Sequence, residues 1–179
     1  PLGSRPTIIT INEDSRGRIY FGTHSLIGIK ASHALFYKDE INNTLKRFDS
    51  PNNQEIKNVY KATTDHLDNI WIFAANGFFR IDKNKNIHKE KWPIGEFLSD
   101  QYYSTIKCDS KGNVWMTSSS EIHSVLSVWN PNTGKVKSYP LKESFSKINN
   151  EFFITQMEFG SKGNIWLSTS YGLMYFDQK

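Results

Sequence analysis

The sequence has very little cysteine and lacks the short motifs that mark the commonest catalytic sites. Cys108 is the single cysteine among 179 residues, so it cannot form a disulfide within the chain. No Gly-x-Ser-x-Gly motif offers a nucleophilic serine, no His-Glu-x-x-His motif offers a zinc site, and the five histidines are scattered. We therefore expect no enzyme, no metal and no cofactor, and we expect Cys108 to be a small buried residue.

Long apolar runs and dense runs of one charge are also missing. No stretch of about 18 apolar residues predicts a membrane span, so we expect a soluble globular segment without membrane contact. The net charge of +4 comes from lysines scattered through the chain, which favours a solvated surface over a face that binds nucleic acid. Hydrophobic residues make up 37% and aromatic residues 14%, which is enough for a packed core.

The first four residues differ in character from the rest of the chain. Residues 1–4, with the sequence PLGS, are typical of the remnant of a cleaved expression tag and do not contribute to the fold prediction. We expect the natural segment to begin near Arg5, so that residues 5–179 form the domain.

One short phrase returns four times along the chain. Each copy is an apolar segment that follows a tight polar turn, and the last turn positions, residues 17, 68, 112 and 163, are 51, 44 and 51 residues apart. A fixed period of this length indicates a repeat architecture in which each unit buries its apolar surface against its neighbours. The four phrases are IYFGT at 19–23, NIWIF at 69–73, NVWMT at 113–117 and NIWLST at 164–169.

The period and the apolar pattern predict an all-β fold built from β-propeller blades. Repeats of about 40–50 residues suit a four-stranded blade, and no long helical periodicity is present. Consecutive apolar residues, as at 113–117, are typical of a strand covered on both faces. We expect about four four-stranded antiparallel repeats near residues 7–52, 53–95, 96–146 and 147–179, the last one strand short, in a partial propeller or an assembling fragment.

The tryptophans and the turns have a structural interpretation. Trp71, Trp115 and Trp166 occupy equivalent positions, which predicts packing between blades rather than a sugar-binding platform. In the turn Asp109–Gly112 the aspartate is expected to cap backbone amides and the glycine to supply a positive φ. Lys111 stands where a calcium loop would need a carboxylate, so we interpret this segment as a turn.

The repeats resemble the two-component regulator propeller repeat. The resemblance rests on the pattern Asp-x-x-Gly-Asn-(Ile/Val)-Trp-(aliphatic)-x-Thr, to which DSKGNVWMT at 109–117 and GNIWLST at 163–169 are similar, and on Gly-Leu-x-x-(Phe/Tyr)-Asp at 172–177. It covers residues 7–179, with Tyr20, Asp68 and Gly160 as departures. That family occurs in the sensor regions of hybrid two-component histidine kinases, many from Bacteroidetes, so the resemblance implies a periplasmic or extracytoplasmic, non-catalytic segment that responds to a carbohydrate.

Ligand-binding residues are expected in the loops that differ between repeats. By analogy with other propellers, these loops join the second strand to the third and the outer strand to the next inner strand. Their aromatic faces suit stacking on sugar rings, and their polar groups suit hydrogen bonds to hydroxyls. The candidate residues are His24, Tyr60, Asn76, Tyr102, Tyr103, Glu121, His123, Asn149, Phe152 and Tyr171.

Two alternatives to a sensor remain open. The chain could be a protein-interaction or self-assembly scaffold whose exposed blades pair with the remaining blades of a parent protein or with a second copy. It could also be a lyase or hydrolase in which His24 or His123 acts with Glu121 as an acid/base pair.

Overall fold

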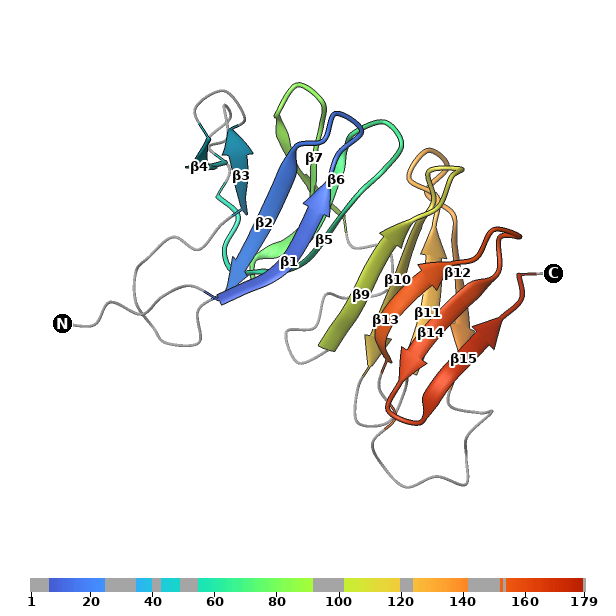
Figure 1. Cartoon of the computed structure of the whole chain (residues 1–179). Coiled ribbons are helices and arrows are strands. Elements are labelled where there is room, and N and C mark those ends of the chain that lie inside the picture. The colour runs from blue at the N-terminus through green and yellow to red at the C-terminus, as the bar shows by residue number, and fades with distance from the viewer. Residues whose placement is uncertain are drawn as a thin grey trace. The chain divides into compact units, whose positions relative to one another are not determined.

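The described part of the chain consists of β-strands joined by turns (Figure 1). The computed structural model describes residues 7–24, 35–39, 43–48, 55–91, 102–119, 124–141, 152 and 154–178. These residues form four antiparallel sheets, and the chain divides into two compact units, Pro1–Trp92 and Pro93–Lys179, with two sheets each. The predicted all-β fold of propeller blades is therefore confirmed.

The first unit holds two four-stranded sheets whose strands follow chain order. The first strands of the two sheets, β1 and β5, lie next to each other. The first sheet consists of β1 (Thr7–Glu13), β2 (Ile19–His24), β3 (Leu35–Asp39) and β4 (Thr44–Arg47). The second consists of β5 (Val59–Thr64), β6 (Ile70–Ala74), β7 (Gly77–Ile81) and β8 (Ile87–Glu90).

The second unit repeats this arrangement with one strand fewer. The first strands of its sheets, β9 and β13, again lie side by side. The third sheet consists of β9 (Tyr102–Cys108), β10 (Val114–Ser119), β11 (Ser124–Trp129) and β12 (Val136–Pro140). The fourth has three strands within the described residues, as predicted: β13 (Ile154–Phe159), β14 (Ile165–Thr169) and β15 (Gly172–Phe176).

The turn between the first two strands of every sheet needs a left-handed residue at its fourth position. Gly17, Gly112 and Gly163 supply it with φ of 80°, 78° and 79°. In the second sheet Asp68 adopts φ of 61° at the same position, which aspartate tolerates better than most residues. The sequence departure at Asp68 therefore leaves the turn geometry unchanged.

The core of each unit lies between its two sheets. In the first unit Tyr20 and Leu35 of the first sheet pack with Ile70, Ile72 and Phe79 of the second. In the second unit the buried residues are Trp115, Leu126, Leu141, Ile154, Met157, Ile165 and Leu167. The alternation along each strand thus sends one set of side chains to a neighbouring sheet and the other set to the opposite face.

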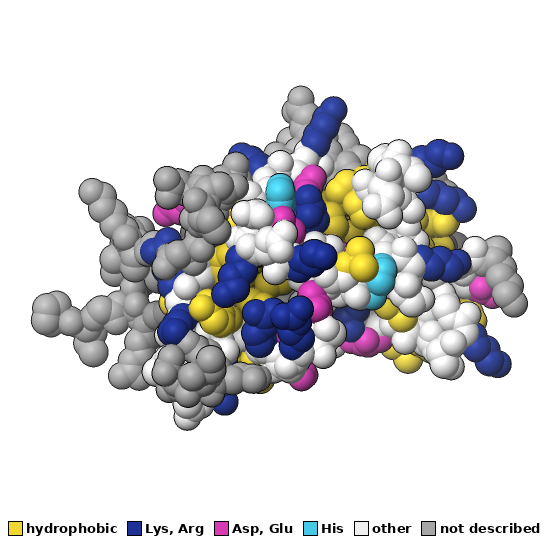
Figure 2. All heavy atoms as spheres, turned by 90° about the horizontal axis from the view of Figure 1, so that it is seen from above, with side chains coloured by type: hydrophobic (Ala, Val, Ile, Leu, Met, Phe, Trp, Pro, Cys, Tyr) yellow, Lys and Arg dark blue, Asp and Glu magenta, His cyan; other side chains and the backbone are white. Residues whose placement is uncertain are grey.

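Two further expectations have a definite outcome in the structure. Cys108, which we expected to be buried, is half-buried at the end of β9 and is free of disulfides. Lysine and arginine side chains are interleaved with acidic and apolar ones on the face that Figure 2 shows.

In the part of the chain that the structure describes, no helix is long and apolar enough to cross a membrane.

Candidate functional site

An aspartate at the start of the turn fixes one end of each of the first three sheets. Asp109 Oδ1 accepts the backbone amides of Lys111 and Asn113, both at 2.9 Å. Its Oδ2 accepts the Asn113 side-chain amide and the Trp115 indole Nε1, also at 2.9 Å each. The predicted cap is thus present and also fixes the buried tryptophan. Asp14, Asp65 and Asp82 accept a corresponding set of four bonds: two from the backbone amides two and four residues later, one from the side chain four residues later, and one from a ring group six residues later. The ring groups belong to Tyr20, Trp71 and His88.

The aspartate turn at Asp82 was missed in the sequence analysis. It joins β7 to β8, and His88 Nε2 lies 2.9 Å from Asp82 Oδ2. The spacing of an aspartate, an asparagine four residues later and a ring donor six residues later would have identified it. Burial is the largest influence on the Asp82 pKa and raises it, but the bonds from His88, Asn86 and Asn84 together outweigh it and lower the pKa to about 2.

The candidate ligand residues that the structure describes lie at the other end of the sheets. In the first unit His24 ends β2, Tyr60 is the second residue of β5, and Asn76 lies in the turn between β6 and β7. Because β1 and β5 run side by side in the same direction, these positions share one end of the unit. The side chain of His24 is outside the described part of the structure.

In each sheet the pairing between the first and second strands has an irregular register close to this end. The ladder skips one residue at Ile9, Tyr60, Ser104 and Thr155, which are equivalent positions in the four sheets. Such bulges redirect the side chains near a strand end and are common next to binding sites. Sequence reasoning missed this feature, because the bulged residues share no chemical character.

Asn76 is engaged within the fold. Its side-chain carbonyl accepts the Lys57 backbone amide at 2.9 Å, and its side-chain amide donates to the Glu55 carbonyl at 2.7 Å. These bonds attach the segment that enters β5 to the β6–β7 turn. Asn76 therefore holds the shape of this end of the second sheet.

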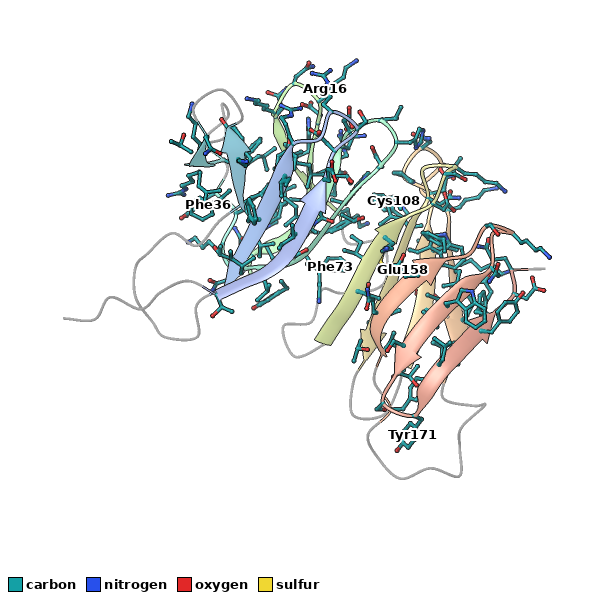
Figure 3. The ribbon with its side chains drawn as sticks, in the orientation of Figure 1. Arg16, Phe36, Phe73, Cys108, Glu158 and Tyr171 are labelled. Atoms are coloured by element: carbon teal, nitrogen blue, oxygen red, sulfur yellow. The ribbon has the colours of Figure 1, made fainter. Side chains whose placement is uncertain are left out.

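In the second unit the structure brings two of the predicted residues together. The rings of Phe152 and Tyr171 are stacked, with centroids 6.2 Å apart and planes 6° from parallel. Phe152 precedes β13, and Tyr171 lies in the turn between β14 and β15, at the end of the sheet where Figure 3 shows it. The Tyr171 side chain is 44% exposed, so the pair presents an aromatic surface to solvent.

Polar groups hold this aromatic pair in place. The Tyr171 backbone amide donates to Thr169 Oγ1 at 3.1 Å, and Thr169 Oγ1 donates to the Gly172 carbonyl at 2.9 Å. The Ser124 hydroxyl donates to the Phe152 carbonyl at 2.9 Å, which ties the third sheet to the fourth. Ser124 and Thr169 were not among our candidates, because their role depends on contacts between sheets.

The remaining candidates have no described side chains. Tyr102 and Tyr103 begin β9 and pair with Ser119 and Ser118, which places their backbone at the same end as Phe152. Glu121, His123 and Asn149 lie outside the described residues.

The described side chains do not gather into a metal-ligand cluster. No group of three or more histidine, cysteine, aspartate or glutamate residues is close enough to hold an ion in that part of the chain. At these strand ends the first unit has the amide of Asn76, and the second unit has the aromatic pair of Phe152 and Tyr171.

The structure was compared with proteins of known structure. No protein-family model matches the sequence, and no curated protein matches it either. Over 99% of this chain, the structure matches the extracellular domain assigned to a hybrid two component system from B. thetaiotaomicron, with a TM-score of 0.68 and 17% identity. The fold is that of β-propeller blades. The match covers 22% of that domain, so the chain spans about a fifth of its length.

Other propellers match with similar scores. Over 99% of this chain, the structure matches a catalytically inactive virginiamycin B lyase from Staphylococcus aureus, solved with quinupristin, with a TM-score of 0.65 and 15% identity. That match covers 57% of the lyase chain. Over 94% of this chain, the structure matches an auxiliary nutrient binding protein from Bacteroides ovatus, with a TM-score of 0.64 and 9% identity. That match covers 46% of the binding protein's chain. Identities this low show a shared fold, on which different functions are built.

Proposed function

We propose that this chain is a non-catalytic, ligand-binding part of an extracytoplasmic sensor propeller and that its ligand is a carbohydrate. The observation that carries the proposal is the stacked pair of half-buried Phe152 and exposed Tyr171 at the end of the fourth sheet. The Asp-x-x-Gly-Asn-(Ile/Val)-Trp repeats, which resemble those of two-component regulators, support the sensor role. The fold likeness to an extracellular domain of such a system supports the location.

A carbohydrate fits the chemistry of this end of the sheets. The faces of aromatic rings stack on the C–H groups of a sugar ring, and exposed tyrosine offers both a face and a hydroxyl. Within the second unit, the bonds from Ser124 to the Phe152 carbonyl and from Thr169 to the Gly172 carbonyl hold the aromatic pair in the position where a sugar ring would stack. Binding of this kind needs no proton transfer, which is why we assign a sensor rather than an enzyme.

The ligand is found by measuring thermal stability against a panel of oligosaccharides. A ligand that binds the folded chain alone raises the melting temperature, with about 2.7 kcal/mol of stabilisation at a concentration one hundred times its Kd. Isothermal titration then gives the Kd for each sugar that shifts the transition. A panel covering neutral, acidic and amino sugars that produces no shift contradicts the proposal.

Tyr171→Ala tests the site itself. Loss of the exposed ring should weaken binding of the active oligosaccharide about five- to tenfold, because an aromatic stacking contact contributes roughly 1 kcal/mol. The matched control is Tyr175→Ala, which removes a tyrosine of comparable exposure, 55% against 44%, from the same hairpin. If the two variants bind the sugar equally well, the ligand does not use the aromatic pair.

The scaffold alternative is favoured by one specific observation. Trp166, predicted to pack between blades, is 39% exposed, whereas Trp71 and Trp115 are each 2% exposed. Buried packing was therefore the right expectation for two of the three tryptophans and wrong for the last. An exposed packing surface of this kind is a place for another protein surface.

A further inference from the structure

Each sheet has two apolar faces, and the chain's own packing shows what each face contacts. The forward face packs on the sheet that follows: Trp115 of the third sheet lies against Phe159 and Phe176 of the fourth, with ring centroids 6.3 and 6.5 Å apart. The backward face packs on the preceding sheet: Met157, Ile165 and Leu167 of the fourth sheet are buried in that joint. A forward face and a backward face are thus the two halves of one joint.

The forward face of the fourth sheet is open. Its members are Trp166, Leu173 and Tyr175, which are 39%, 70% and 55% exposed. Trp166 and Tyr175 form an edge-to-face pair with centroids 5.1 Å apart, so the surface is ordered by its own packing. Contiguous exposed apolar side chains of this kind mark interaction surfaces.

The backward face of the first sheet is open as well. By register, Ile11, Phe21 and Phe36 correspond to Met157, Leu167 and Met174 of the fourth sheet. Met157 is fully buried, whereas Ile11 is 63% exposed, and Phe21 and Phe36 are half-buried. Phe36 projects from β3 in Figure 3. The first sheet therefore presents the pattern that its counterparts bury against a preceding sheet.

We propose that the forward face of the fourth sheet binds the backward face of the first sheet in a second copy of this chain. The argument for a second copy is that one chain carries both halves of the joint, in the same residue pattern by which its own sheets pack. The proposal is independent of the carbohydrate site, which lies at the ends of the strands.

The charged residues of the first sheet are compatible with this joint. Glu13 and Lys38 stand where the fourth sheet has Phe159 and Phe176. The joint inside the first unit already contains a cation over an aromatic ring, because Lys85 Nζ of the second sheet lies 5.3 Å from the Tyr37 ring centroid of the first. Lys38 is placed to make the same kind of contact with the aromatic pair of the partner.

A joint between unlike faces leaves one free face on each outer subunit. Such heterologous association either closes into a ring or continues as a chain of copies. The mass of the wild-type chain measured by light scattering should therefore rise from 20.7 kDa to multiples of that value as the concentration increases from about 1 to 500 µM.

A mixing experiment tests which faces meet. Trp166→Glu disables the forward face and Ile11→Glu disables the backward face, so each variant alone should stay monomeric. Their mixture retains one complete joint, between the forward face of the Ile11 variant and the backward face of the Trp166 variant, and should form heterodimers with no larger species. Both positions are substantially exposed, and circular dichroism and melting temperature verify that the variants fold.

Leu67→Glu is the matched control. Leu67 is 61% exposed in a turn outside both faces, so this variant should associate like the wild type. A wild-type chain that stays monomeric throughout the concentration range overturns the proposal. So does association that survives Trp166→Glu, or a mixture of the two variants that remains monomeric.

Discussion

At the scale of single residues, one carboxylate fixes the first turn in each of the first three repeats. Asp109 receives four hydrogen bonds, and one of them satisfies the indole N–H of a tryptophan that is almost fully buried. A buried donor without an acceptor costs about 1–3 kcal/mol, so burial of this tryptophan requires the carboxylate that accepts its N–H. The bonds also lower the Asp109 pKa: burial, the largest effect, raises it, but the donors led by Asn113 and Trp115 outweigh it.

The fourth repeat lacks this carboxylate. Gly160 forms the same backbone turn, donating to the Asn164 carbonyl at 2.9 Å as Asp109 does to Asn113 at 3.0 Å. The atoms nearest to a Cβ at Gly160 would be those at the end of the Asn164 side chain, at 2.5 to 2.9 Å, and φ is not in the left-handed region. Asn164 can rotate away from this Cβ. Its counterpart Asn113 adopts an orientation in which its side-chain amide donates to Asp109.

Gly160→Asp should therefore stabilise the chain. New bonds to the turn amides and to Asn164, together with lower backbone entropy in the unfolded state, should add about 1–2 kcal/mol, or roughly 2–8 °C in melting temperature. Gly160→Ala is the control, since it supplies the Cβ without the acceptor. An alanine variant that is as stable as the aspartate variant would show that the missing bonds do not matter.

At the scale of elements, side chains in the turns connect one strand or sheet to the next. Asp68 accepts the Ser15 backbone amide at 2.9 Å and the Ser15 hydroxyl at 2.8 Å, which joins the turn of the second sheet to that of the first. These two bonds from Ser15 lower the Asp68 pKa. The departure from glycine at this position thus provides a contact between sheets.

The β7–β8 hairpin should lose stability in acid. The Asp82 pKa of about 2 in the folded chain lies below the ordinary value of 3.8, so folding favours the ionised form. This contribution is complete above about pH 4 and disappears as the pH falls through about 2. After allowance for solvent screening of a partly exposed carboxylate, it should amount to about 1–2 kcal/mol.

Urea unfolding of Asp82→Asn between pH 2 and 7 measures this effect. The wild type should be more stable near pH 6, and the difference should shrink steadily below pH 4. Lys83→Gln, an exposed change in the same turn, should give a difference from the wild type without that dependence. A constant difference between wild type and Asp82→Asn across the range would contradict the assignment.

At the scale of the whole molecule, the repeat period predicted the sheets well. The four phrases located β2, β6, β10 and β14, because a polar turn followed by consecutive apolar residues is a strong local signal. The stacking of Phe152 on Tyr171 was not predicted, although both residues were candidates, because it depends on how two loops meet. The exposure of Trp166 was not predicted either, since equivalent sequence positions differ in their neighbours.

The sheets of each unit pack face to face, and the second sheet of each pair covers an aromatic ring of the first, Tyr20 in the first unit and Trp115 in the second. Fluorine NMR of chain labelled with 5-fluorotryptophan tests this most directly, with the Trp166 and Trp115 signals assigned by Trp→Phe variants. Measured in Ile11→Glu, which should be monomeric, the Trp166 resonance should shift between H₂O and D₂O while the Trp115 resonance stays unchanged. Equal solvent shifts at both positions would contradict the packing on which the fold, the ligand site and the open faces all depend.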